Sequence, residues 1–170
     1  MLLRGTQAGS ATMRHAAGGK RQAANGKWQV ASGKWPLLSS DDPTMLNTVM
    51  VVDDSETDLL ITRMVLERAG VAASLLLMAS GADALAYLAD PQHPQIDLIL
   101  LDINMPGMSG FEFLGRYQQQ CAQPVPVVML SSSPDPADRV RAFAHAFVQD
   151  FFTKPLDAAL AAGLPARFRP

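Results

Sequence analysis

The chain alternates short apolar runs with amphipathic segments, and this alternation begins at Leu46. Apolar runs between turn residues predict buried strands, and apolar residues at helical spacing predict helices. The predicted strands are residues 48–52, 75–78, 96–102, 125–130 and 151–153, and the predicted helices are residues 55–69, 80–88, 110–119, 135–147 and 156–162. Strictly alternating strands and helices favour an α/β fold, with a doubly wound five-stranded parallel sheet covered by helices on both faces.

The last predicted helix is short. Only residues 156–162 are available to it before Gly163 and Pro165, two residue types that end helices. We therefore expect the folded domain to span residues 45–162 and residues 163–170 to form a basic C-terminal tail.

Residues 1–44 have a different composition from the rest of the chain. They are rich in Ala, Gly, Ser, Gln and Lys, and they hold six basic and two acidic residues, against eight basic and fourteen acidic residues afterwards. Because they lack a helix or strand period, they are predicted to form a disordered basic extension. Trp28 and Trp35, in a short near-repeat, leave two interpretations open: a tail that docks on a partner, or an extension without function ahead of a true start at Met45.

Two counts bear on the location of the protein. The single cysteine, Cys121, excludes an internal disulfide framework and suits a reducing compartment. No apolar run approaches the roughly 18 residues that a membrane span needs. The sequence therefore predicts a cytoplasmic protein that does not enter a membrane, and it shows no helix-turn-helix pattern that would predict direct DNA binding.

Acidic residues follow two of the predicted strands. Asp102 ends the apolar run that begins at Ile96, and Asp53 and Asp54 follow the run Val49–Val52. In open α/β sheets, ligands bind beyond the carboxyl ends of the strands, so these carboxylates are expected to meet at one edge. Carboxylates at such short distances from one another must be neutralised or shift their pKa. Mg²⁺ prefers such oxygen ligands and can supply the neutralising charge.

The last two predicted strands end in residues that suit a phosphoryl group. Ser131, Ser132 and Ser133 follow the fourth strand, and Lys154 follows the fifth. A hydroxyl and an ammonium can bind phosphoryl oxygens. We select Ser131 because it follows the apolar run directly.

In this order the motifs resemble the response-regulator receiver domains of two-component signalling, similar to the chemotaxis regulator, over roughly residues 46–160. The resemblance is carried by the acid pair Asp53–Asp54, the motif DxxMPxMxG from Asp102 to Gly110, Ser131, Phe151 and Lys154–Pro155. It implies a flavodoxin-like strand order of 2-1-3-4-5. Because no output domain follows residue 162, the chain resembles the stand-alone type of receiver.

The resemblance also implies a role for each motif residue. Asp102 would be the phosphoacceptor, and Asp53, Asp54, Asp102 and the backbone carbonyl of Asn104 would bind Mg²⁺. Lys154 would neutralise the phosphoryl group, and Pro155 would hold a cis peptide bond with it. Ser131 and Phe151 would form the switch.

The implied function is that of a signal receiver. It would take a phosphoryl group from a sensor histidine kinase or a histidine phosphotransfer protein. It would then contact a downstream protein, or a second copy of itself, through the surface of the fourth helix, fifth strand and last helix. On this interpretation the chain is no enzyme beyond catalysing its own phosphorylation and dephosphorylation.

Two alternatives stay open at this point. A haloacid-dehalogenase-like phosphatase also places an Asp nucleophile, a hydroxyl, a Lys and Mg²⁺ on a parallel sheet. That family has a second Asp two residues after the nucleophile, where this chain has Asn104. An unphosphorylated pseudo-receiver that serves only in binding usually lacks one of the acids or the lysine, all of which are present, but the short last helix keeps it in view.

Overall fold

The sheet and its helices occupy most of the chain, and the computed structural model describes residues 29–31, 45–133 and 135–169. The described strands are β1 (Gln29–Ala31), β2 (Leu46–Val52), β3 (Ala72–Met78), β4 (Leu98–Asp102), β5 (Val127–Ser131) and β6 (Val148–Thr153). The described helices are α1 (Glu56–Arg68), α2 (Gly81–Leu88), α3 (Gly110–Gln120), α4 (Pro136–Ala142) and α5 (Ala158–Phe168).

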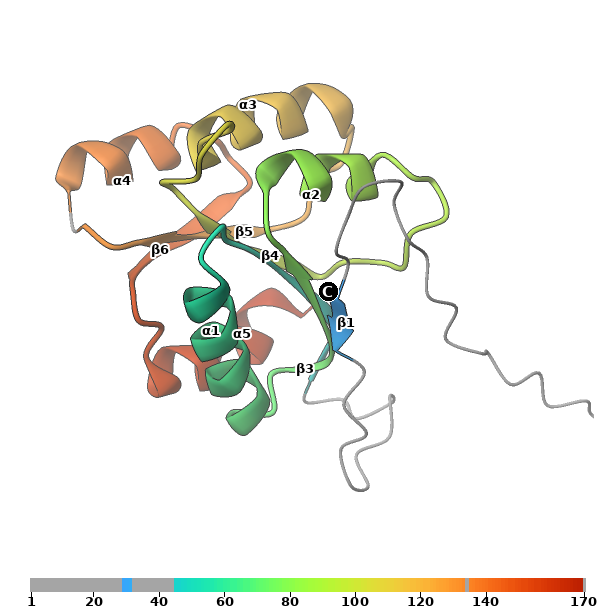
Figure 1. Cartoon of the computed structure of the whole chain (residues 1–170), viewed down its shortest axis with the longest axis vertical. Coiled ribbons are helices and arrows are strands. Elements are labelled where there is room, and N and C mark those ends of the chain that lie inside the picture. The colour runs from blue at the N-terminus through green and yellow to red at the C-terminus, as the bar shows by residue number, and fades with distance from the viewer. Residues whose placement is uncertain (1–28, 32–44, 134, 170) are drawn as a thin grey trace, which may run out of the picture.

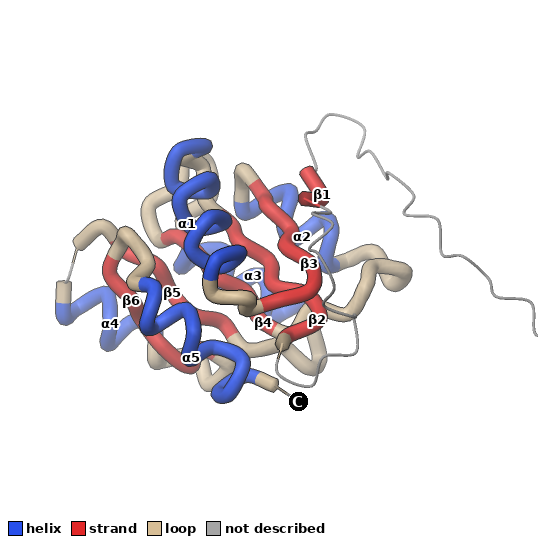
Figure 2. The backbone as a smooth tube through the Cα atoms, turned by 90° about the horizontal axis from the view of Figure 1, so that it is seen from below, coloured by secondary structure: helices blue, strands red, loops and turns tan. Residues whose placement is uncertain are grey.

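The strands form one sheet in the order β1-β3-β2-β4-β5-β6. The strands from β2 to β6 are all parallel to one another. This confirms the predicted five-stranded parallel sheet, whose order 2-1-3-4-5 corresponds to β3-β2-β4-β5-β6. Figure 1 shows α1 and α5 on one face of the sheet and α2, α3 and α4 on the other, and Figure 2 shows α1 and α5 side by side over their face.

Two hydrophobic clusters form the core, one on each face of the sheet. In β2, Met50 and Val52 pack into the cluster that includes α2 and α3, whereas Val49 and Val51 pack into the cluster that includes α1 and α5. Successive side chains of a strand point to opposite faces, so a strand covered on both sides needs apolar residues at every position. This is why the central strands read as continuous apolar runs.

The prediction of a short last helix is wrong. Helix α5 runs from Ala158 to Phe168 and includes Pro165, so residues 163–168 are part of the domain and not of a tail. Leu164 is fully buried and Phe168 is 8% exposed, both in the α1–α5 cluster. Burying a large apolar side chain contributes about 1.5–3 kcal/mol, enough for these two to offset a proline in a helix, which costs about 3 kcal/mol.

The fourth helix is shorter than predicted and the last strand is longer. Helix α4 ends at Ala142, and β6 begins at Val148. The Val127 N–H already donates to the Phe147 carbonyl at 2.9 Å, so this part of the chain pairs with β5 and cannot continue as a helix.

The strand β1 has no counterpart in the sequence prediction. It pairs antiparallel with β3, and the partners run from Gln29 opposite Leu77 to Ala31 opposite Leu75. The rest of the predicted disordered extension, with Trp28 and Trp35, lies outside the described residues. Within the described part of the chain, none of the helices has the length and apolar character needed to cross a membrane.

Candidate functional site

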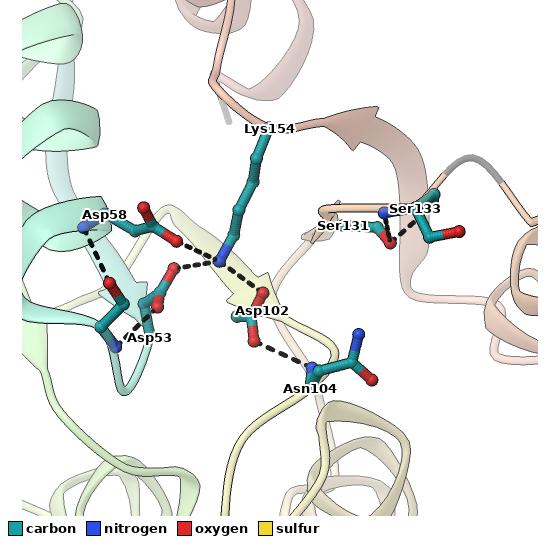
Figure 3. Close-up of polar contacts among 8 residues, drawn as sticks. Asp53, Asp58, Asp102, Asn104, Ser131, Ser133 and Lys154 are labelled. Atoms are coloured by element: carbon teal, nitrogen blue, oxygen red, sulfur yellow. Dashed lines mark hydrogen bonds and ion pairs between the residues drawn. The ribbon is translucent and has the colours of Figure 1, made fainter.

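The candidate site lies at the carboxyl ends of β2, β4, β5 and β6 (Figure 3). Asp102 is the last residue of β4 and Ser131 is the last of β5, whereas Asp53 and Lys154 directly follow β2 and β6. The parallel register aligns these ends, with Val52 opposite Leu101 and Asp102 opposite Leu130. The fold therefore brings together side chains that are up to about a hundred residues apart in the sequence, as the strand-end patterns predict.

Lys154 is the centre of the site. Its Nζ lies 2.6 Å from Asp53 Oδ2, 2.6 Å from Asp102 Oδ1 and 3.1 Å from Asp58 Oδ2 (Figure 3). The lysine side chain is only 11% exposed. Because an ammonium has three protons, each of the three carboxylates can accept one of them. Asp58 was not among the residues predicted for the site.

The surroundings change the pKa of both partners in the buried pair. Burial lowers the pKa of Lys154, but its hydrogen bonds to Asp102, Asp53 and Asp58 together raise that pKa above its usual value. Burial also raises the pKa of Asp53, and the contacts with Lys154 and the Ser55 backbone oppose this only in part. The lysine therefore stays charged, and negative charge at Asp53 is costly unless a cation is close.

Three carboxylates have the donor chemistry of a divalent cation site. Asp53, Asp54 and Asp102 each offer an oxygen, and these oxygens lie within 4.8 Å of one another. Asp53 and Asp102 are buried, whereas Asp54 is exposed at the rim, which leaves one side open for water and a phosphoryl group. Hard oxygen donors of this kind, combined with the costly charge on Asp53, fit Mg²⁺.

The backbone after Asp102 holds the carboxylate in place. The Asn104 N–H donates to Asp102 Oδ2 at 2.8 Å, while Oδ1 accepts from Lys154. Both carboxylate oxygens of Asp102 are thus engaged and the side chain has a fixed orientation. The Asn104 side chain is exposed beside the site, and the metal-binding role of its carbonyl stays a prediction.

The turn between β4 and α3 brings the helix unusually close to Asp102. The Gly110 N–H donates to the Ile103 carbonyl at 2.8 Å. A Cβ atom on Gly110 would lie 2.4 Å from the Asp102 carbonyl oxygen, so only glycine fits here. Ser109 and Glu112 form a complete capping box at the start of α3, which fixes this approach.

Ser131 does not contact the carboxylate cluster. Its side chain is buried, and its Oγ donates to the Ser133 carbonyl at 2.7 Å and accepts from the Ser133 N–H at 3.1 Å (Figure 3). The hydroxyl is therefore bound to its own loop. Ser131 still joins the two strand ends, because its carbonyl accepts from the Lys154 N–H at 2.8 Å.

Phe151 lies inside the domain. It is 7% exposed and packs in the α2–α3 cluster. The Arg139 guanidinium on α4 donates to the Phe151 carbonyl at 3.1 Å and lies 5.8 Å from the centre of its ring. The Lys154–Pro155 peptide bond is cis. The predicted switch pair thus lies beside the site, with each member engaged in contacts away from Asp102.

Comparison with known proteins identifies the family. The family model of the response regulator receiver domain matches residues 49–161. The chain belongs to this family. It is 31% identical over 116 residues to "Two-component response regulator ORR1" of Oryza sativa subsp. japonica, covering 65% of this chain and 50% of the rice protein. It is 30% identical over 110 residues to "Protein PilH" of Pseudomonas aeruginosa, covering 64% of this chain and 86% of that protein.

Solved structures give the same answer. A two-component response regulator from Cytophaga hutchinsonii is similar with a TM-score of 0.69 and 26% identity, covering 73% of this chain and 97% of that one. The chemotaxis protein CheY4 of Vibrio cholerae gives a TM-score of 0.60 and 27% identity, covering 72% and 98% of the two chains. The chain therefore has a receiver domain of two-component signalling, and this family takes the place of the haloacid-dehalogenase-like phosphatase among the alternatives. The receiver spans about half the length of the rice relative.

Proposed function

We propose that Asp102 receives a phosphoryl group from the phosphohistidine of a sensor histidine kinase or a histidine phosphotransfer protein. The observation that carries this proposal is the buried contact of 2.6 Å between Asp102 Oδ1 and Lys154 Nζ, beside the two further carboxylates of a cation site. A carboxylate held by a lysine and next to a divalent cation site is equipped for phosphoryl transfer, which depends on positioning and charge neutralisation.

In the transfer step an oxygen of Asp102 attacks phosphorus and forms a new P–O bond. The P–N bond of the phosphohistidine breaks, and its electron pair returns to the imidazole nitrogen of the donor. Lys154 stabilises the negative charge on the phosphoryl oxygens, because its ammonium already lies at Asp102. Mg²⁺ bound by Asp53, Asp54 and Asp102 would supply further positive charge for the same oxygens.

The chain is proposed to catalyse only its own phosphorylation and dephosphorylation. Water would hydrolyse the acyl phosphate on Asp102, and the exposed Asn104 side chain would flank that water. No other substrate is needed for this cycle. The output is contact with another protein in the cytoplasm rather than direct binding to DNA or a membrane.

The proposed switch uses the two engaged residues described above. A phosphoryl oxygen on Asp102 would compete with Ser133 for the Ser131 hydroxyl and draw the β5–α4 loop towards the site. Movement of that loop would change the position of α4, where Arg139 contacts both the carbonyl and the ring of Phe151. Phosphorylation would in this way be read on the surface of α4, β6 and α5.

That surface has apolar side chains suited to a partner or to a second copy of the chain. Val140 and Phe143 near α4 are 75% and 41% exposed, and Leu160 on α5 is 43% exposed. Leu156 and Leu164 are buried and do not contribute to this surface. We expect sedimentation with beryllofluoride, a phosphoryl mimic, to show a homodimer absent from the untreated protein. A monomer in both states would refute dimerisation through this surface.

The phosphoacceptor is tested by intact mass after incubation with acetyl phosphate and Mg²⁺. The wild type should gain one phosphoryl group, and Asp102→Asn should gain none. Asp54→Asn, which retains the nucleophile, serves as a control that should label slowly. Equal labelling of the wild type and Asp102→Asn would refute the assignment of Asp102. No labelling of either protein would favour the pseudo-receiver alternative.

A further inference from the structure

The third carboxylate on Lys154 is the contact that the receiver mechanism above leaves unexplained. Asp58 comes from the first turn of α1, and its side chain is 37% exposed, whereas the side chains of Asp53 and Asp102 are 1% and 4% exposed. Its oxygen also lies farther from Nζ, at 3.1 Å against 2.6 Å for the other two. Asp58 is therefore the most distant and most accessible of the three acceptors, and its contact with Lys154 has the geometry of a hydrogen bond.

The start of α1 leaves the Asp58 side chain free for this contact. In α3 the equivalent acid, Glu112, accepts from the backbone N–H of the N-cap Ser109 at 2.9 Å. In α1 the N-cap Ser55 accepts from the Asp58 N–H at 3.2 Å, but the Ser55 N–H donates to Asp53 Oδ1 at 3.0 Å. Because Asp53 fills that role, the Asp58 carboxylate has no capping partner and reaches Lys154 instead.

A phosphoryl group on Asp102 needs at least one of the three protons of Lys154. Asp53 is buried and takes part in the cation site. The hydrogen bond from Lys154 to Asp58 is therefore the one that can be broken at the lowest cost, which frees a Lys154 proton for the phosphoryl group. Asp58 also adds a fourth negative charge to Asp53, Asp54 and Asp102. That charge attracts a metal cation and repels an incoming phosphoryl group.

We propose that Asp58 is a positioning residue of this receiver: it holds Lys154 over Asp102 in the unphosphorylated state and competes with the phosphoryl group for that lysine. The inference rests on the proposed function of Asp102. It has a specific consequence, because removal of the Asp58 charge should affect the two ligands of the site in opposite directions. A residue that only stabilises α1 would not separate them.

The test uses Asp58→Asn in the full chain at about 0.15 M salt, where charges beyond about 8 Å are screened. Isothermal titration measures Mg²⁺ binding, and ¹⁹F NMR measures beryllofluoride binding at saturating Mg²⁺. We expect roughly two- to fivefold weaker Mg²⁺ binding and roughly two- to fivefold tighter beryllofluoride binding, the range of a partly exposed ion pair. The ¹⁵N resonance of the Lys154 ammonium should also shift.

Two control variants isolate the contact with Lys154. Glu56→Gln removes the same charge from an exposed residue in the same turn of α1, and it should leave both affinities within error of wild type. Asp58→Glu keeps the charge and should restore wild-type binding. If Asp58→Asn does not fold, as judged by thermal melting, Asp58→Ser is measured in its place.

Two results would overturn the inference. One is that Asp58→Asn changes both affinities in the same direction, and the other is that it behaves like Glu56→Gln. Failure of the wild type to label at Asp102 would instead refute the proposed function. The two failures can be distinguished, because the Mg²⁺ titration and the lysine resonance do not depend on phosphorylation.

Discussion

Substitution of Gly110 by alanine tests how closely α3 must approach the phosphoacceptor. The new Cβ would lie 2.4 Å from the Asp102 carbonyl oxygen, 3.0 Å from Ile103 Cα and 3.2 Å from the Asp102 carbonyl carbon. All three are backbone atoms, so no side chain can rotate away. An ordinary contact begins at 3.4 Å, and either the end of β4 or the start of α3 must therefore move by about 1 Å.

The size of the effect follows from two opposing terms. Overpacking of this kind costs about 1–3 kcal/mol, and the exchange of glycine for alanine in a helix returns about 0.5–1 kcal/mol. We expect a net loss of up to about 2.5 kcal/mol in the free energy of unfolding. A shift of about 1 Å in a reacting group can cost about 10²-fold in rate, so labelling of Asp102 should slow by about ten- to a hundredfold.

Urea denaturation and the time course of labelling by acetyl phosphate with Mg²⁺ measure the two effects. Gly115→Ala is the matched control, because it makes the same exchange in the same helix and its Cβ would have no atom within 4 Å. It should stabilise the domain by about 0.5–1 kcal/mol and label normally. If both variants have the same stability and label at the wild-type rate, the argument from close approach is refuted.

Three further predictions concern other parts of the domain. Burial raises the pKa of Tyr117 to about 12, so the folded state favours the neutral phenol. Up to about 3 kcal/mol of the free energy of unfolding should therefore be lost between about pH 10 and 12. Urea denaturation should show a smaller loss in Tyr117→Phe, and an equal loss would contradict this. Asp54→Ala should weaken Mg²⁺ binding by calorimetry and raise the metal-free melting temperature, because it relieves repulsion among carboxylates that lie within 4.8 Å; unchanged affinity would count against the cation site. A variant that starts at Met45 should label like the full chain, since the site is built from later residues; slower labelling by intact mass would show that the extension acts on the site.

Much of the site could be predicted because its residues follow apolar runs. Asp53, Asp102 and Ser131 come at the ends of strands buried on both faces, and parallel pairing aligns such ends at one edge of the sheet. Asp58 carries no such signal. A carboxylate in the first turn of a helix is usually interpreted as a favourable interaction with the helix dipole. The contact of Asp58 with Lys154 joins residues 96 positions apart, so it depends on tertiary packing.

The errors in the predicted fold have a common origin, because each prediction relied on the residues of one short segment. Gly163 and Pro165 predict the end of a helix, but the burial of Leu164 and Phe168 against the sheet continues α5 through them. Strand β1 has only three residues, too few for an alternating pattern, and its pairing partner lies more than forty residues away. In both cases tertiary contacts decide the structure, and a single segment of sequence does not contain them.

The pairing of β1 with β3 has a consequence for the behaviour of this protein in concentrated solution. Without β1, Leu75–Leu77 would be an unpaired outer strand, which is a template on which other chains can add. Because β1 belongs to the same chain, it competes for that template at an effective concentration on the order of millimolar. Below that level each molecule should close its own sheet. Above it, or after removal of β1, intermolecular strand exchange should compete, and association would then depend on protein concentration rather than on phosphorylation.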